Sequence, residues 1–142
     1  MSFASMSSSP AMSPSNFMRN VLRMDALSCV ACGLLQVIFT SQMASHLNLP
    51  QSLVAYTGEF LLVYAAAVAF VSTRRPIPRP VVWVLVAGNL GWAASCLLLL
   101  ASGQVAPSAL GTAYVVMQAL TVALLAGLQL FGLRSAAERR DW

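Results

Sequence analysis

Four long apolar stretches, separated by short polar connections, limit the folds open to this chain. They cover residues 26–44, 52–72, 80–101 and 108–133. A helix needs about 20 apolar residues to cross the hydrocarbon core of a bilayer, and an open sheet would leave backbone groups unpaired in lipid. We therefore predict an all-α polytopic membrane protein, a bundle of four transmembrane helices.

The composition supports lipid as the solvent. Hydrophobic residues make up 58% of the chain and charged residues 8%, against about 45–50% and about 25% in soluble domains. A chain of 142 residues cannot bury so much apolar surface in water, so the lipid bilayer is the first partner. The net charge of +4 does not indicate nucleic acid, because the arginines flank the apolar stretches instead of alternating with aromatics.

The arginines predict the orientation of the bundle. Short loops make neighbouring helices antiparallel, in up-down-up-down order. All eight basic residues then fall at one end, and these are Arg19, Arg23, Arg74, Arg75, Arg79, Arg134, Arg139 and Arg140. Basic residues gather on the cytoplasmic side of membranes. Arginine without lysine is typical of a GC-rich genome. We therefore expect a multi-pass protein of the bacterial inner (plasma) membrane, with both termini cytoplasmic.

Two polar tails flank the predicted transmembrane domain, which covers residues 19–135. Residues 1–18 are rich in Ser, Met and Pro and carry no charge, which predicts a disordered cytoplasmic tail. Residues 136–142 form a short cytoplasmic tail. Asp25 precedes the first apolar stretch and is expected to cap its helix. A cleaved signal peptide is disfavoured, because Gln42 occupies the −3 position, where a small residue is needed.

Five polar residues form a candidate intramembrane site. Glu59 is the only acidic residue inside a predicted span, where a charged carboxylate costs several kcal/mol unless it is neutralised or hydrated. Asn89 and Gln118 fall near the middle of their spans, and Tyr56 and Tyr114 share helix faces with Glu59 and Gln118. These groups predict either a protonatable or ligand-binding centre, or interhelical hydrogen bonds worth about 0.6–2 kcal/mol each.

Small residues at four-residue spacing predict close helix packing. Such faces let two helix backbones approach closely. They are Ala87, Gly91 and Ser95 in the third stretch, and Ala119, Ala123 and Gly127 in the fourth. We expect them to join these two helices; contact between two copies of the chain is the alternative.

The chain carries no recognisable catalytic motif. It lacks H-E-x-x-H, G-x-S-x-G, the P-loop and the dinucleotide glycine pattern, so no catalytic residue, metal or cofactor is predicted. Cys29 and Cys32 form C-x-x-C near the basic end of the first helix. A membrane enzyme of thiol or quinone chemistry is therefore a third hypothesis, although disulfide chemistry is expected on the outer side.

The order and spacing of several short motifs resemble a known kind of protein. These motifs lie between residues 20 and 135: Asp25-Ala26, Gly58-Glu59, Leu61-Leu62, Tyr64-Ala65, Asn89-Leu90, Trp92, Ser95, Gly111-Thr112-Ala113-Tyr114, Gln118-Ala119, Gln129 and Gly132-Leu133-Arg134. The chain resembles a family of small uncharacterised bacterial four-helix integral membrane proteins and, more distantly, DoxX-like proteins. The resemblance implies topology and location, and no activity.

Two functions follow from these observations. The first is a non-enzymatic structural, assembly or regulatory membrane component, acting as a homo-oligomer or with a membrane-protein partner. The alternative is a small proton-coupled transporter or small-molecule-binding membrane protein centred on Glu59.

Overall fold

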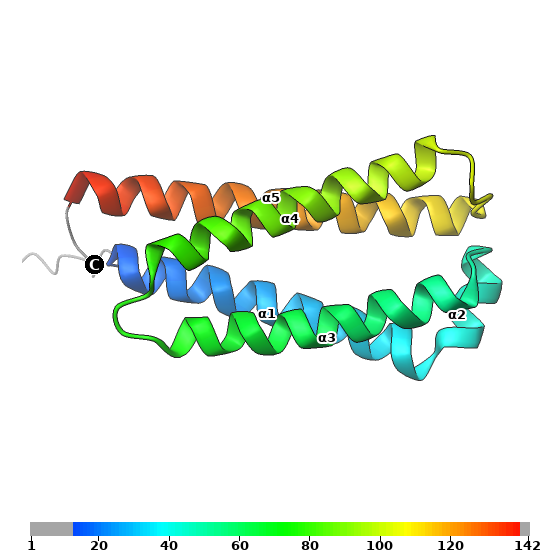
Figure 1. Cartoon of the computed structure of the whole chain (residues 1–142), viewed down its shortest axis with the longest axis horizontal. Helices are drawn as coiled ribbons and strands as arrows, with labels where there is room; N and C mark the ends of the chain where they lie inside the picture. The colour runs from blue at the N-terminus through cyan, green and yellow to red at the C-terminus, as the bar shows by residue number, and fades with distance from the viewer. Residues whose placement is uncertain (1–12, 140–142) are drawn as a thin grey trace, which may run out of the picture.

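A computed structural model describes residues 13–139, all of whose regular structure is helical. Four long helices lie lengthwise beside one another, and the short α2 covers one end (Figure 1). The helices are α1 (Pro14–Ile38), α2 (Thr40–Leu47), α3 (Gln51–Thr73), α4 (Arg79–Ala101) and α5 (Ala109–Arg139). The four long helices are long and apolar enough to cross a membrane, which confirms the predicted fold class and gives the chain the build of a multi-pass membrane protein.

The first helix begins much earlier than the sequence analysis predicted. The side chain of Ser13 accepts a hydrogen bond from the Asn16 backbone N–H at 3.3 Å, and Pro14 occupies the first turn, where its missing N–H costs nothing. Residues 14–18 are therefore helical and not part of a disordered tail; residues 1–12 lie outside the described residues. The prediction that Asp25 caps this helix is wrong, because Asp25 lies in its interior.

The first apolar stretch also ends differently from its prediction. Instead of one span to residue 44, α1 stops at Ile38, Phe39 leaves helical geometry with φ −111°, and α2 follows. The Thr40 hydroxyl bonds back to the Gln36 carbonyl at 2.6 Å, a contact that competes with regular helix bonding. Asn48, with φ 51°, then terminates α2 in the left-handed conformation.

The remaining spans agree more closely with the sequence analysis. α3 and α4 match the predicted residues 52–72 and 80–101 to within one residue. α5 extends six residues beyond the predicted end at residue 133, so residues 136–139 continue the helix and do not form a tail. Prolines explain the sharp starts, since Pro50 precedes α3 and Pro80 lies in the first turn of α4.

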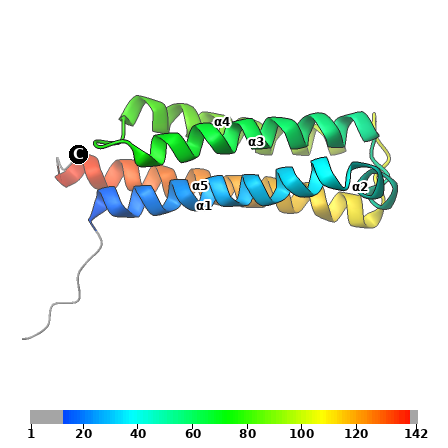
Figure 2. The same cartoon turned by 90° about the horizontal axis from the view of Figure 1, so that it is seen from below.

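The four long helices form a four-cornered bundle made of two pairs. α1 packs along α3, α4 packs along α5, and α1 also contacts α5, as the two perpendicular views show (Figure 2). At the fourth corner α3 touches α4 through the stacked rings of Phe60 and Trp92, whose centroids are 5.4 Å apart. The basic end of the bundle holds the start of α1 and the α3–α4 loop; the Arg-free end holds α2 and the α4–α5 loop.

Glycines set the close contact between α1 and α3, but not those that were predicted. A Cβ atom on Gly33 of α1 would lie 3.0 Å from the Gly58 carbonyl oxygen of α3, and one on Gly58 would lie 2.7 Å from Gln36 Cβ. The backbones of α1 and α3 can meet so closely only because both positions lack a side chain.

The predicted small-residue face between α4 and α5 is wrong in all but one position. Ala119 is buried, whereas the other five residues are exposed: Ala87, Gly91, Ser95, Ala123 and Gly127. A Cβ atom on Gly91 or Gly127 would meet nothing within 4 Å. Four-residue spacing marks one face of a helix but does not say which way that face points.

Large apolar side chains also cover the outside of the bundle. Each long helix directs some of them outward, including Leu27, Val63, Leu98 and Leu124, which are 65–72% exposed. Soluble monomers rarely expose apolar surface of this extent. The outward-facing surface therefore suits lipid, as the composition predicted.

Candidate functional site

A buried carboxylate lies at the centre of the bundle. Asp25 is 0% exposed, and along α1 it lies about 17 Å from the first residue and about 20 Å from the last. One side chain from each of the other long helices reaches it, together with Cys29 from the next turn of α1. We call Asp25, Cys29, Tyr64, Asn89 and Gln129 the Asp25 cluster.

Three donors converge on one oxygen of this carboxylate. The Gln129 amide nitrogen donates to Asp25 Oδ2 at 2.8 Å, the Asn89 amide nitrogen at 3.1 Å, and the Tyr64 hydroxyl lies 3.5 Å away. The other oxygen, Oδ1, accepts from the Cys29 thiol at 3.6 Å. Asn89 also donates to Gln129 Oε1 at 3.3 Å, so the cluster is a connected network.

The hydrogen-bond partners that the described residues give Asp25 are all uncharged. Arg19, six residues away on α1, instead donates to the backbone carbonyls of Ser72 and Arg74 at the end of α3. Arg23 is exposed. A buried charge is costly unless it is paired and hydrogen-bonded. In this cluster, hydrogen bonds from uncharged side chains alone stabilise the Asp25 carboxylate.

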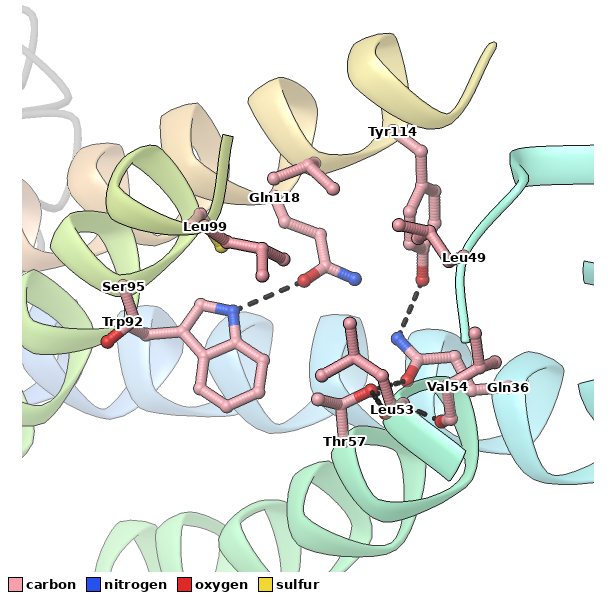
Figure 3. A pocket seen from close by; sticks show the side chains of 12 residues that line it. Gln36, Leu49, Leu53, Val54, Thr57, Trp92, Ser95, Leu99, Tyr114 and Gln118 are labelled. Carbon is pink, nitrogen blue, oxygen red and sulfur yellow. Dashed lines mark hydrogen bonds between the residues drawn. The ribbon is translucent and has the colours of Figure 1, made fainter. Parts of the chain in front are cut away.

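The second candidate region is the largest of three cavities that Trp92 helps to line. It has a volume of about 250 Å³ and lies in the Arg-free half, and we call it the large cavity (Figure 3). Residues of α1, α3, α4 and α5 line it, together with Leu49 from the loop before α3. Most of its lining is aliphatic or aromatic. The lining residues are Gln36, Leu49, Leu53, Val54, Thr57, Trp92, Ser95, Cys96, Leu99, Tyr114, Val115 and Gln118.

A few polar groups converge on the large cavity. Gln36 is only 2% exposed; its amide nitrogen donates to the Tyr114 hydroxyl at 2.7 Å, and its amide oxygen accepts from Thr57 at 2.6 Å. The Trp92 indole N–H donates to Gln118 Oε1 at 3.2 Å, and both side chains point inward (Figure 3). Because Tyr114 accepts from Gln36, its own O–H hydrogen is left to donate.

Two further cavities share lining residues with the large cavity and with the Asp25 cluster. A middle cavity of about 180 Å³ shares Trp92, Tyr114 and Gln118 with the large cavity. A small cavity of about 70 Å³ shares Trp92 with both and Cys29 with the middle cavity. Its lining includes Tyr64, Asn89 and Cys29. We call the large, middle and small cavities together the row of cavities. The small one is lined by side chains that bind Asp25.

The structure does not bring the five predicted site residues together. Glu59 and Tyr56 are exposed on the outer face of α3, so a centre around Glu59 is wrong in its geometry. Asn89 belongs to the Asp25 cluster, and Gln118 and Tyr114 line the large cavity. The statement that Glu59 is the only acidic residue inside a span is also wrong, since Asp25 lies within α1.

Sequence reasoning missed Asp25 and Gln129, the two fully buried members of the cluster. Hydropathy alone starts the apolar stretch at residue 26, after Arg19, Arg23 and Asp25, and so leaves Asp25 outside the span. The Ser13-Pro14 pair, an N-cap residue followed by a first-turn proline, was the signal that could have moved the helix start and placed Asp25 inside the span.

The cysteines support no metal site. Cys29, Cys32 and Cys96 are free thiols, and the described residues contain no group of three or more His, Cys, Asp or Glu side chains able to hold a metal ion. Cys29 acts instead as a weak donor to Asp25, and Cys96 lines the large cavity.

Comparison of the chain with protein-family models, curated proteins and solved structures finds no match. The resemblance to small bacterial four-helix membrane proteins and to DoxX-like proteins therefore stays a prediction.

Proposed function

We propose that this chain is a non-enzymatic, multi-pass membrane protein that binds a small, largely apolar molecule in the large cavity. The observation that carries the proposal is the apolar lining interrupted by the Tyr114 hydroxyl, which is fixed by Gln36 at 2.7 Å and keeps its own hydrogen to donate. Concave, mostly apolar sites with a few placed polar groups are the usual form of small-molecule sites.

The size and chemistry of the ligand follow from the same residues. A cavity of about 150 Å³ is enough to bind benzene, so about 250 Å³ suits a molecule of two fused rings or a short branched chain. The free donor on Tyr114 favours a ligand with one acceptor oxygen. The long helices that line the cavity carry exposed apolar side chains on their outer faces, which suit lipid, and this favours a molecule that dissolves in the bilayer.

The proposed location is the bacterial inner membrane, with both termini in the cytoplasm. Its support is the distribution of arginine: Arg19, Arg74, Arg75, Arg79 and Arg134 lie towards the basic end, and the connections at the other end contain neither Arg nor Lys. The large cavity would then lie in the periplasmic half of the bundle. An alkaline phosphatase fused after Trp142 should be inactive in cells; an active fusion would reverse the orientation.

A role as an assembly component is the second candidate function. One observation favours it: Glu59 is exposed on α3, about 12 Å along the helix from its Arg-free end. An acidic side chain at such depth normally faces protein or a water-filled space. A partner helix or a second copy of the chain covering this face would supply that environment.

The ligand proposal is tested with 6-fluoro-1-tetralone, a ketone of two fused rings. The full chain in lipid nanodiscs is titrated with this probe and followed by fluorine NMR, with empty nanodiscs as the control for partition into lipid. We expect a saturable bound signal with the wild type. Val115→Phe, which fills the large cavity, should lose that signal, and Val84→Phe, on the exposed face of α4, should keep it. Identical spectra from protein-loaded and empty nanodiscs would contradict the proposal.

A further inference from the structure

The two oxygens of the Asp25 carboxylate differ in the hydrogen bonds they accept: Oδ2 accepts strong ones from amides, and Oδ1 accepts only a weak one. Oδ2 receives the amide donors of Gln129 and Asn89 at 2.8 and 3.1 Å, with the Tyr64 hydroxyl 3.5 Å away. Oδ1 has the Cys29 thiol at 3.6 Å, and a thiol is a weak donor that can also accept. A proton placed on Oδ1 therefore leaves every bond to Oδ2 in place.

The same geometry disfavours a metal cation. The nitrogen atoms of both amides, and not their oxygen atoms, face Oδ2, and N–H groups repel a cation. The Gln129 oxygen is already engaged as an acceptor from Asn89. The Asn89 oxygen lies 3.3 Å from the Tyr64 hydroxyl, whose single hydrogen it shares with Asp25 Oδ2. A proton is the cation that this cluster can accept without rotating its amides.

The other ionisable groups near Asp25 are few. From α1 the facing group is the Cys29 thiol, and from α3 it is the Tyr64 hydroxyl. α4 and α5 present the uncharged amides of Asn89 and Gln129. Protonation of Asp25 thus changes the net charge at the centre of the bundle by one unit, with no charged hydrogen-bond partner among the described residues to offset it.

Shared lining residues make the row of cavities the candidate route for that proton. The small cavity, at about 70 Å³, has the volume of about two waters; its lining is mostly apolar, and Cys29, Tyr64 and Asn89 are the groups that could bind water there. Cys29 lines both this cavity and the middle one. We propose that Asp25 is a proton-binding site at the centre of the bundle, reached through the cavities from the Arg-free end. This proposal does not depend on what the large cavity binds.

The proton reaches Asp25 through the Cys29 thiol, in a step that conserves atoms and charge. The sulfur takes a proton from a hydronium ion in the small cavity, which becomes water, while the thiol gives its own proton to Asp25 Oδ1. Cys29 ends as a neutral thiol, and Asp25 gains one proton and loses its negative charge. The new O–H then donates to the sulfur across the same contact.

Isotope labelling can observe Asp25 alone, because the chain contains only two aspartates, Asp25 and Asp141. An Asp141→Asn chain labelled with ¹³C at the aspartate side-chain carboxyl is placed in bilayers and followed by solid-state NMR. We expect one carboxyl signal that moves in a single step with pH and is unaffected by exchanging sodium for potassium. A signal that stays fixed over the whole pH range in which the protein remains folded would overturn the proposal, as would a signal that follows sodium.

The route is tested by blocking it. Val122 lines the middle and small cavities and is replaced by Trp; the control is Val63→Trp on the exposed face of α3. The readout is the rate at which the infrared C=O band of protonated Asp25 shifts in D₂O. Each added barrier of about 1.4 kcal/mol slows exchange about tenfold, so we expect at least this slowing in Val122→Trp and none in the control.

Equal exchange rates in Val122→Trp and the control would overturn the route through the cavities. Leu61→Phe, which narrows the same two cavities, gives the same comparison should Val122→Trp not fold. Failure of the tetralone probe to bind would remove the proposed ligand site, while the ¹³C measurement would still decide the role of Asp25.

Discussion

The two halves of the bundle differ in how they fill their interior. Towards the basic end, side chains of all four long helices interlock, and Met18, Leu22, Val68 and Val82 are fully buried. Towards the Arg-free end, a second core of buried residues that includes Leu47, Val54 and Val115 lies beside the large and middle cavities, and Asp25 lies where the two regions meet. Both halves therefore hold the bundle together, and the Arg-free half also leaves room to bind a small molecule.

The largest expected effect tests the packed half. Leu22→Ala should lower the free energy of unfolding by about 2–5 kcal/mol, because the rigid surroundings cannot collapse into the space left behind. Leu53→Ala, in the wall of the large cavity, should cost about 1 kcal/mol or less. Unfolding in bicelles measures both values. Equal losses would mean that the two halves do not differ in packing.

The second prediction compares Asp25, which is buried in α1, with Glu59, which is exposed on α3. Asp25→Leu removes the acceptor of several buried donors and should cost about 1–3 kcal/mol. Glu59→Leu, on the exposed face of α3, should change the stability of the monomer by less than about 0.5 kcal/mol. The same unfolding assay in bicelles measures the free energy of unfolding of both variants. A larger loss for Glu59→Leu would show that its face is covered by protein.

The difference between these carboxylates also shows what the sequence could predict. Length and hydropathy were sufficient for the helical class and for α3 and α4, because prolines mark their starts and the apolar stretches have clear ends. They failed for α1, where Arg19, Arg23 and Asp25 interrupt the hydropathy although the helix continues through them.

The sites were harder to predict than the spans. Periodicity placed Asn89, Gln118 and Tyr114 correctly on inward faces, because polar residues in membrane helices usually face the bundle. It placed Glu59 incorrectly, since helical spacing gives relative directions within one helix and not the rotation of that helix against its neighbours. Gln129 lies close to Asp25 although 104 residues separate them in the chain, a pairing that only the folded bundle reveals.

The smallest predicted effect concerns the donor in the large cavity. Tyr114→Phe removes the hydroxyl that would bind the ligand oxygen and should weaken binding of 6-fluoro-1-tetralone about fivefold, corresponding to about 1 kcal/mol. Tyr56→Phe is the matched control, because Tyr56 is 71% exposed on α3. Fluorine NMR titration compares the two, and unchanged affinity in Tyr114→Phe would remove the hydroxyl from the site.

The most direct test of the difference between the halves is to locate a bound molecule by contact. Methyl-labelled protein saturated with 6-fluoro-1-tetralone is examined for nuclear Overhauser effects between probe and protein. The account predicts contacts with Leu53, Leu99 and Val115 in the large cavity and none with Val68 or Val82 in the packed half. Contacts with the packed half, or with lipid alone, would contradict it.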